Sequence, residues 1–386
     1  MRFDTVFRGG SVFDAALGKF ETRDLFIRDG AIQPAPTGPY EADCAIDAAG
    51  KAVVPGLIDE HGHWDLNGSL IGANADTLCI PNGVTTACDG GTCGASNFVQ
   101  FYNANLIRYE PEVLSYLNVS TFGNKSLCRH EEDHDPADFR PDLIRALFHR
   151  YPDTLRGLKV RMCKATLGDY GMAPLLRAIE ISDGLQREGF HCPVVVHYDD
   201  LPANVTVADL FGALRGGDVV AHVFQTKAET IFEADGAVKK AVLDARRRGV
   251  WMDDCHGRVH WSFPNLETAF AQGFFPDFVS SDMVRVSEYA RPGFSLPFAM
   301  SVLSAAGAPA ETILKAVTYT PAKALGILDR AGTLEAGRPA DVTVLDIQKT
   351  DQIFSDRYGN DRPGNLLFVP LLTMKRGRTA YRQLFF

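Results

Sequence analysis

The feature that most constrains the fold is an alternation of short apolar segments with helix-length amphipathic segments between about residues 55 and 330. The expected strands are 157–162, 193–197, 218–222, 249–253 and 278–282, and the helices that follow them are 173–188, 206–215, 237–248, 265–272 and 296–306. Strand-helix alternation implies a parallel sheet, and its length suits a (β/α)8 TIM barrel. An open doubly wound sheet is the competing fold. No Gly-x-Gly-x-x-Gly opens a helix after the first strand, which weakens a dinucleotide-binding interpretation.

The two ends of the chain are rich in short strands and turns instead. Thr5-Val6-Phe7-Arg8 precedes a Gly-Gly turn, and residues 341–346 alternate in polarity as a strand does. We therefore expect an α/β protein in which a TIM barrel carries a small β-sandwich domain built from both termini. The predicted limits are 1–54 and 335–386 for the composite β domain and 55–334 for the barrel.

Charge and composition exclude several kinds of partner. The formal net charge is -9 and no basic tract stands out, which argues against nucleic acid and anionic membrane surfaces. No run approaches the ~20 apolar residues of a membrane span, and the first residues lack the apolar core of a signal peptide. The 8 cysteines are scattered, as expected of reduced core residues. These features predict a cytoplasmic location.

Two histidines close the first expected strand of the barrel. The run Val53-Val54-Pro55-Gly56-Leu57-Ile58-Asp59-Glu60-His61-Gly62-His63 is apolar until its last residues. Alternate side chains of a strand point to the same side, so His61 and His63 can face one metal ion. Asp59 lies on that side too and could orient one of the rings.

Further polar residues lie at the ends of later strands. Each has an ordinary explanation alone: Lys159 could extend outward to solvent, His197 and His222 could be polar strand ends, and Asp282 could cap a helix. Their joint occurrence on successive strands favours a shared metal site, because the active sites of such barrels lie at the carboxyl ends of the strands.

The lysine in this set has a specific chemical use. A neutral ε-amine can take up carbon dioxide to form a carbamate, which can bridge two cations as two-metal hydrolytic sites require. The pKa of the amine must be lowered by burial for this to happen. Lys164 is the alternative, but it comes past the expected strand end, so we favour Lys159.

Several stretches resemble the amidohydrolase superfamily of metal-dependent hydrolases, in particular its dihydroorotase-like amidohydrolase and deacetylase subgroup. They are Pro55–His63, Gly83-Val84-Thr85-Thr86-Ala87-Cys88-Asp89-Gly90-Gly91, Gly157–Met162 with Gly168-Asp169-Tyr170-Gly171, and Gly332–Asp341. The resemblance covers essentially the whole chain.

What the resemblance implies is a binuclear centre with carboxylated Lys159 between two divalent metal ions. It makes His61 and His63 ligands of the more buried ion, and His197 and His222 ligands of the second. Asp282 is implied both as a ligand of the first ion and as the catalytic group that handles the proton. These ligand types suit Zn2+ best, with Mn2+ and Fe2+ as alternatives. The implied reaction is hydrolysis of an amide or ester of a small molecule, such as an N-acyl or O-acyl carboxylate, or the opening of a cyclic amide.

Other candidate residues follow the strands. His256 comes just after residues 249–253, where its imidazole could reach over the pocket and bind substrate, or serve as a structural loop residue. Arg161 could meet a substrate carboxylate bidentately, or form a salt bridge in the barrel rim. The run Arg129–Asp135 resembles a metal cluster in composition, but without strand spacing we interpret it as a solvated acidic surface.

Two rival functions are considered. A heterocycle aminohydrolase (a deaminase) is the nearest, but such enzymes commonly use one metal without a bridging lysine. A non-catalytic scaffold on the same fold is the other, and the filled ligand positions argue against it. We also expect a homo-oligomer, since enzymes of this kind often assemble symmetrically.

Overall fold

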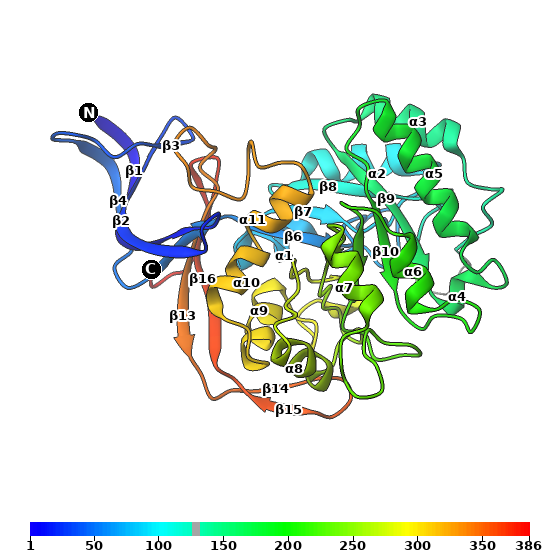
Figure 1. The fold of residues 1–386 in the computed structure, drawn as a ribbon. Coiled ribbons are helices and arrows are strands. Elements are labelled where there is room, and N and C mark those ends of the chain that lie inside the picture. The colour runs from blue at the N-terminus through cyan, green and yellow to red at the C-terminus, as the bar shows by residue number, and fades with distance from the viewer. Residues whose placement is uncertain (126–131) are drawn as a thin grey trace.

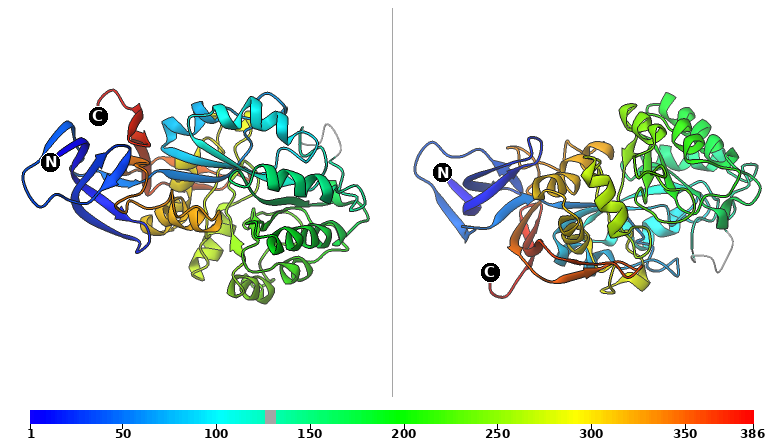
Figure 2. Two further views of the ribbon diagram at one scale, coloured as in Figure 1. Left: turned by 90° about the horizontal axis from the view of Figure 1, so that it is seen from above. Right: turned by 60° about the horizontal axis from the view of Figure 1, so that its bottom comes forward.

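The structure is a computed structural model and describes residues 1–125 and 132–386. It contains two large sheets placed side by side (Figure 1), with both chain ends at the far side of the first sheet. Figure 2 shows from two further directions that most of the helices lie around the second sheet. The fold therefore separates a strand-rich part from a strand-helix part.

The second sheet has seven parallel strands in the order β12-β11-β10-β9-β8-β7-β6. Their bounds are β6 Leu57–Gly62, β7 Val84–Asp89, β8 Glu112–Asn118, β9 Leu155–Met162, β10 Val194–Tyr198, β11 Val219–Ala221 and β12 Trp251–Met252. Nearly every residue of β6 to β11 is buried, as expected of strands covered on both faces. The predicted parallel sheet is confirmed.

The expected last strand joins the two edges of this sheet. Phe278 makes a parallel bridge to Asp253 beyond β12, and Met283 makes one to Gly62 in β6. The segment 278–283 thus closes the ring of the barrel through single bridges and backbone hydrogen bonds rather than as a regular strand. This closure brings Asp282 beside the end of the first barrel strand.

The five helices predicted after the later strands are present as α5 to α9, and six further α-helices lie elsewhere in the described residues. Their bounds are α1 Ala75–Leu78, α2 Phe98–Ala104, α3 Pro141–Arg150, α4 Lys164–Leu167, α5 Ala173–Arg187, α6 Val207–Ala213, α7 Lys240–Arg247, α8 Phe263–Ala271, α9 Leu296–Ala305, α10 Ala310–Ala316 and α11 Tyr319–Ala324. In α5, Leu175, Ala178 and Leu185 are buried at helical spacing, so one stripe packs on the sheet and the rest faces solvent. The amphipathic pattern read from the sequence has this origin.

The first sheet combines strands from both ends of the chain. Its bounds are β1 Arg2–Asp14, β2 Lys19–Arg28, β3 Ala31–Gln33, β4 Glu41–Asp47, β5 Ala52–Pro55, β13 Val342–Lys349, β16 Leu366–Lys375 and β17 Arg378–Arg382. β13 pairs antiparallel with β5, which joins the two termini in one sheet. A separate hairpin consists of β14 Ile353–Ser355 and β15 Asp361–Pro363. The two-layered β-sandwich and the domain limits 1–54, 55–334 and 335–386 stay predictions.

In the part of the chain that the structure describes, we find no helix with both the length and the apolar character that membrane crossing requires.

Candidate metal centre

The end of β6 fixes the position and tautomer of His63. Thr92 Oγ1 donates a hydrogen bond to Asp89 Oδ2 at 2.8 Å and lies 2.7 Å from His63 Nδ1. Since the hydroxyl proton is used for Asp89, the threonine oxygen accepts from His63 Nδ1–H. The lone pair of His63 Nε2 is then free for a cation, and a hydrogen-bonded carboxylate behind the ring is the usual support of a metal-binding imidazole.

Lys159 and His61 meet in the interior of the barrel. Lys159 lies within β9 and is only 2% exposed, and His61 is 1% exposed. Lys159 Nζ lies 3.1 Å from His61 Nε2. Burial lowers the pKa of Lys159 and lowers the pKa of His61 well below its usual range. Both groups are thereby favoured in their neutral forms, which the carbamate and the ligand roles require. Lys164, by contrast, is exposed at the start of α4.

The next two strands place a second pair of imidazoles. His197 is the penultimate residue of β10 and His222 follows β11, with His222 Nε2 2.9 Å from His197 Nδ1. His222 Nδ1 lies 2.8 Å from the carbonyl oxygen of Cys255, which can only accept, so this nitrogen carries the proton. Burial lowers the pKa of both rings well below the usual value. His197 Nε2 is buried and has no hydrogen-bond partner among the described residues.

Asp282 lies opposite the first pair of histidines. Its Oδ1 is 3.5 Å from His63 Nε2 and 4.0 Å from His61 Nε2. The backbone of Asp282 has φ 46°, a left-handed conformation that is uncommon for residues other than glycine. Such strain is concentrated at functional sites, where the surrounding structure holds it in place.

Asp59 supports this strained segment instead of orienting a histidine ring. Its carboxylate accepts hydrogen bonds from Ser281 N at 2.9 Å and from Ser281 Oγ at 2.6 Å. Burial raises the pKa of Asp59 to about 6, against the opposing effect of these hydrogen bonds. The predicted contact with a ring is therefore wrong, because the closing segment, which the sequence could not place, takes up both oxygens.

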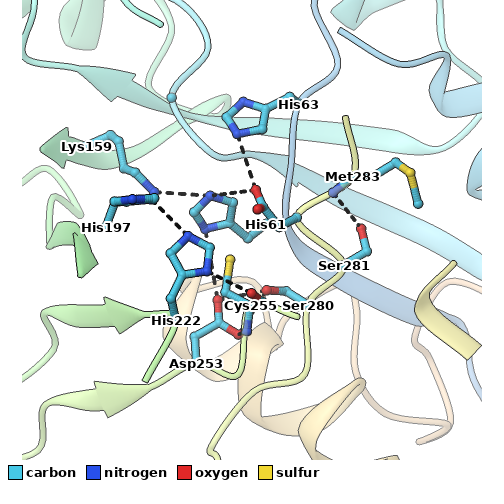
Figure 3. A network of polar contacts seen from close by, with 12 residues as sticks. His61, His63, Lys159, His197, His222, Asp253, Cys255, Ser280, Ser281 and Met283 are labelled. Atoms are coloured by element: carbon cyan, nitrogen blue, oxygen red, sulfur yellow. Dashed lines mark hydrogen bonds and ion pairs between the residues drawn. The ribbon is translucent and has the colours of Figure 1, made fainter. Parts of the chain in front are cut away.

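The donor atoms lie close enough together to hold cations. One group within 4.8 Å of one another consists of His61, His63 and Asp282, and another of His222, His260 and Asp282. Figure 3 shows the rings of His61, His63, His197 and His222 turned toward one another with the Lys159 amine among them. Neutral imidazoles and a carboxylate are the donor set that Zn2+ prefers. The residues present thus fit a divalent metal.

His260 is a member of this cluster that the sequence did not suggest. Its ring centroid lies 4.0 Å from that of His222 and 5.3 Å from that of His197, and Nδ1 is 3.7 Å from Asp199 Oδ2. It comes from the loop after β12, where no strand register indicates the direction of a side chain. A histidine seven residues past the expected strand has no sequence pattern around it that indicates a place in the site.

His256, the histidine that was predicted to bind substrate, points elsewhere. It is fully buried, its ring stacks on Trp261 at 4.2 Å, and Nδ1 lies 2.9 Å from Asp254 Oδ2. It is absent from the lining of the cavity, whereas His260 is part of it. The position of His256 therefore gives no support to a contact with substrate.

The cavity over the cluster has a volume of about 400 Å³. Its lining includes His61, His63, Lys159, His197 and Asp282 as well as Arg161. Arg161 Nη1 donates to Glu132 Oε2 at 2.7 Å, so the guanidinium forms the rim salt bridge that was one of its two expected roles. The cavity is large enough for a small molecule next to the metal-binding groups.

Part of the run Arg129–Asp135 is buried, contrary to the expected acidic surface. The Glu132 side chain is 4% exposed and also accepts from Asn118 Nδ2 at 2.7 Å, and His134 is buried beside β9. Burial alone would raise the pKa of Glu132, but the charges of Arg161 and His134 and the hydrogen bonds from Arg161 and Asn118 together outweigh burial, and the pKa is lowered. The interpretation is wrong for these residues because Arg161 supplies a partner; residues 129–131 lie outside the described part.

A glycine makes room for the first histidine. A Cβ atom on Gly90 would lie 2.2 Å from His61 Nε2, inside any allowed contact. We expect Gly90→Ala to displace the His61 ring and to cost about 1–3 kcal/mol of stability, as overpacking does. Gly212→Ala is the control: its Cβ meets nothing within 4 Å in α6, and it should gain about 0.5–1 kcal/mol. Urea unfolding of both variants measures the difference; equal stabilities would contradict the clash.

The fold and this cluster define a class of protein, a parallel barrel with a candidate metal centre at the carboxyl ends of its strands. Residues 256–377 match the sequence model of the Amidohydrolase family. Over 330 residues the chain is 28% identical to a deacetylase from Enterococcus faecalis, with 85% of this chain and 86% of that protein covered.

Solved structures agree with this similarity. A crystal structure of an adenine deaminase superposes with a TM-score of 0.88 at 26% identity, covering 99% of this chain and 100% of that one. A crystal structure of a dihydroorotase gives 0.83 at 25% identity, covering 98% of each chain. The predicted resemblance to the amidohydrolase superfamily is confirmed.

Proposed function

We propose that this protein is a binuclear metal-dependent hydrolase that cleaves an amide or ester bond of a small molecule. Its substrate is an N-acyl or O-acyl carboxylate or a cyclic amide. The observation that carries the proposal is that three imidazoles, one buried lysine and one aspartate line a single cavity, with the ring of His222 in contact with that of His197. The ligands in this proposal are His61, His63, Lys159, His197, His222 and Asp282.

Two divalent ions, in our proposal Zn2+, would lower the pKa of a water toward about 7 and polarise the substrate carbonyl. Lys159, carboxylated in this proposal, would lie between the two histidine pairs, since its amine already lies beside His61. The low pKa of this amine, which follows from burial, supports its reaction with carbon dioxide. The left-handed turn held by Asp59 and Ser281 presents Asp282 to the cavity.

Asp282 is the proposed catalytic acid and base. Its carboxylate would take a proton during attack and deliver it to the leaving amine or alkoxide. His61, His197 and His222 would bind without competing for that proton, because burial lowers their pKa values well below the usual range. Arg161 would keep its salt bridge to Glu132 and would chiefly shape the rim of the cavity.

The similarity to a deacetylase supports deacylation as the reaction, and the similarity to a dihydroorotase supports cleavage of a C–N bond. The second candidate, a heterocycle aminohydrolase, is favoured by the close superposition on an adenine deaminase. Lys159 argues for the first, because the amine is buried among the proposed ligands and has no role in a site with one metal. We further propose a cytoplasmic location and a homo-oligomeric state.

A hydrolysis screen on zinc-loaded protein tests the proposal. N-acyl amino acids, acetylated hydroxy acids and cyclic imides are offered beside adenine and related heterocycles, and acid, alcohol and ammonia release are measured separately. We expect turnover of an acyl or cyclic amide compound and about two metal ions per chain. Ammonia release from a heterocycle with one ion per chain would establish the deaminase instead.

A further inference from the structure

A second arginine in the cavity, Arg258, lacks among the described residues the carboxylate partner that Arg161 and Lys227 have. Arg258 lines the cavity and follows Gly257, which lies beside the carboxylate of Asp282. A Cβ on Gly257 would lie 2.8 Å from Asp282 Oδ2, and Gly257 N donates to Ser281 O at 3.1 Å. Arg258 therefore begins directly beside the reacting end of the cavity.

The guanidinium of Arg258 makes few contacts. Nη1 donates to Val286 O at 3.2 Å, whereas Nε is buried and has no hydrogen-bond partner within the described ranges. No described carboxylate lies within 4.0 Å of it, although Asp282 is nearby. A buried donor without an acceptor costs free energy. Because Arg258 lines the cavity, a rotation of its side chain would bring this donor to an acceptor there.

Two other cations of the lining are already paired with carboxylates. Lys227 pairs with Asp199 at 2.9 Å, and Arg161 pairs with Glu132. Arg357 is exposed at the cavity, and the Asp200 carboxylate makes no ion pair with Arg258. Among the described lining residues, Arg258 is thus a half-buried cation that has no ion pair with a carboxylate.

We propose that Arg258 binds the carboxylate of the substrate, which rests on the hydrolase proposed above. A guanidinium binds a carboxylate through two parallel hydrogen bonds, and the unpaired Nε would supply one of the two donors once the side chain turns toward the cavity. Because Arg258 begins next to Asp282, the bound carboxylate lies close to the bond that is cleaved. This geometry fits an acylated α-amino or α-hydroxy acid, in which one carbon separates carboxylate and acyl group, and disfavours neutral acyl compounds.

The test compares charged and neutral ligands in two enzymes. Binding of N-acetyl amino acids, each paired with its carboxamide, is measured by calorimetry on zinc-loaded Asp282→Asn protein, with and without Arg258→Met. In the protein that keeps Arg258, we expect those N-acetyl amino acids that bind best to bind about 10- to 100-fold more tightly than their carboxamides. We expect Arg258→Met to remove that preference. Affinity for the carboxamides should stay unchanged, and Arg258→Lys should retain part of the preference.

Arg357→Met is the control for a general effect of positive charge, and it should keep the preference. A preference that survives Arg258→Met, or no preference in any pair, overturns the proposal. Thermal unfolding shows whether each variant is folded. Hydrolysis of the same panel by protein with native Asp282 is a separate readout: if nothing is hydrolysed, the proposed reaction fails, while the binding comparison still decides the role of Arg258.

Discussion

Lys159→Ala is expected to lose most of the bound metal and nearly all activity. The side chain is buried beside His61, and alanine leaves no donor between the two histidine pairs. Loss of an outer-shell partner alone costs about 10- to 100-fold in metal affinity or activity, so loss of a bridging ligand should cost more. Metal content by mass spectrometry and the hydrolysis rate measure both effects.

Two additional measurements make this result specific. A short carboxylic acid such as propionate should partly restore activity in Lys159→Ala, because it can replace the carbamate in the space that the side chain leaves. Lys164→Ala is the matched control: the residue is exposed at the start of α4, so its loss should be mild. Undiminished turnover in Lys159→Ala would rule out the bridge, and a collapse in Lys164→Ala would point to the other lysine.

Asp282→Asn should preserve the fold and lower the rate about 10²-fold or more, as removal of a general acid and base does. Asparagine tolerates the left-handed backbone at this position, so the φ of 46° gives no reason for unfolding. The hydrolysis rate at saturating zinc measures the loss, and circular dichroism checks the fold.

Asp200→Asn is the control for Asp282→Asn, since it makes the same change at another left-handed position of the same cavity. We expect its rate to stay within a few-fold of the original. An unchanged rate in Asp282→Asn would remove this residue from proton transfer. The metal content of Asp282→Asn is measured in parallel. If zinc has dissociated from this variant, the lower rate reflects the loss of a zinc ligand instead of the loss of proton transfer.

The strands and helices of the fold could be predicted because the spacing of apolar residues within each segment determines them. Residues within each segment form the apolar runs of β9 and β10. Residues within α5 likewise form its buried stripe. A strand also fixes which way its side chains point. The convergence of Lys159 on His61 therefore follows from positions within two strands and from the parallel order of the sheet.

The loops could not be predicted in this way. His256 and His260 are four residues apart after β12, and only the tertiary structure decides that the first stacks on Trp261 and the second faces His222. Glu132 has the composition of a surface residue, but Arg161 balances its charge in the interior. In each case a partner distant in sequence, rather than a local pattern, determines the position.

The most direct measurement is anomalous X-ray diffraction from crystals grown with zinc and bicarbonate. Our account requires two zinc peaks inside the barrel mouth, with continuous density for an extra carboxylate on the amine of residue 159. A barrel mouth that stays empty in zinc, or proposed donor side chains that turn away from a common centre, would contradict it.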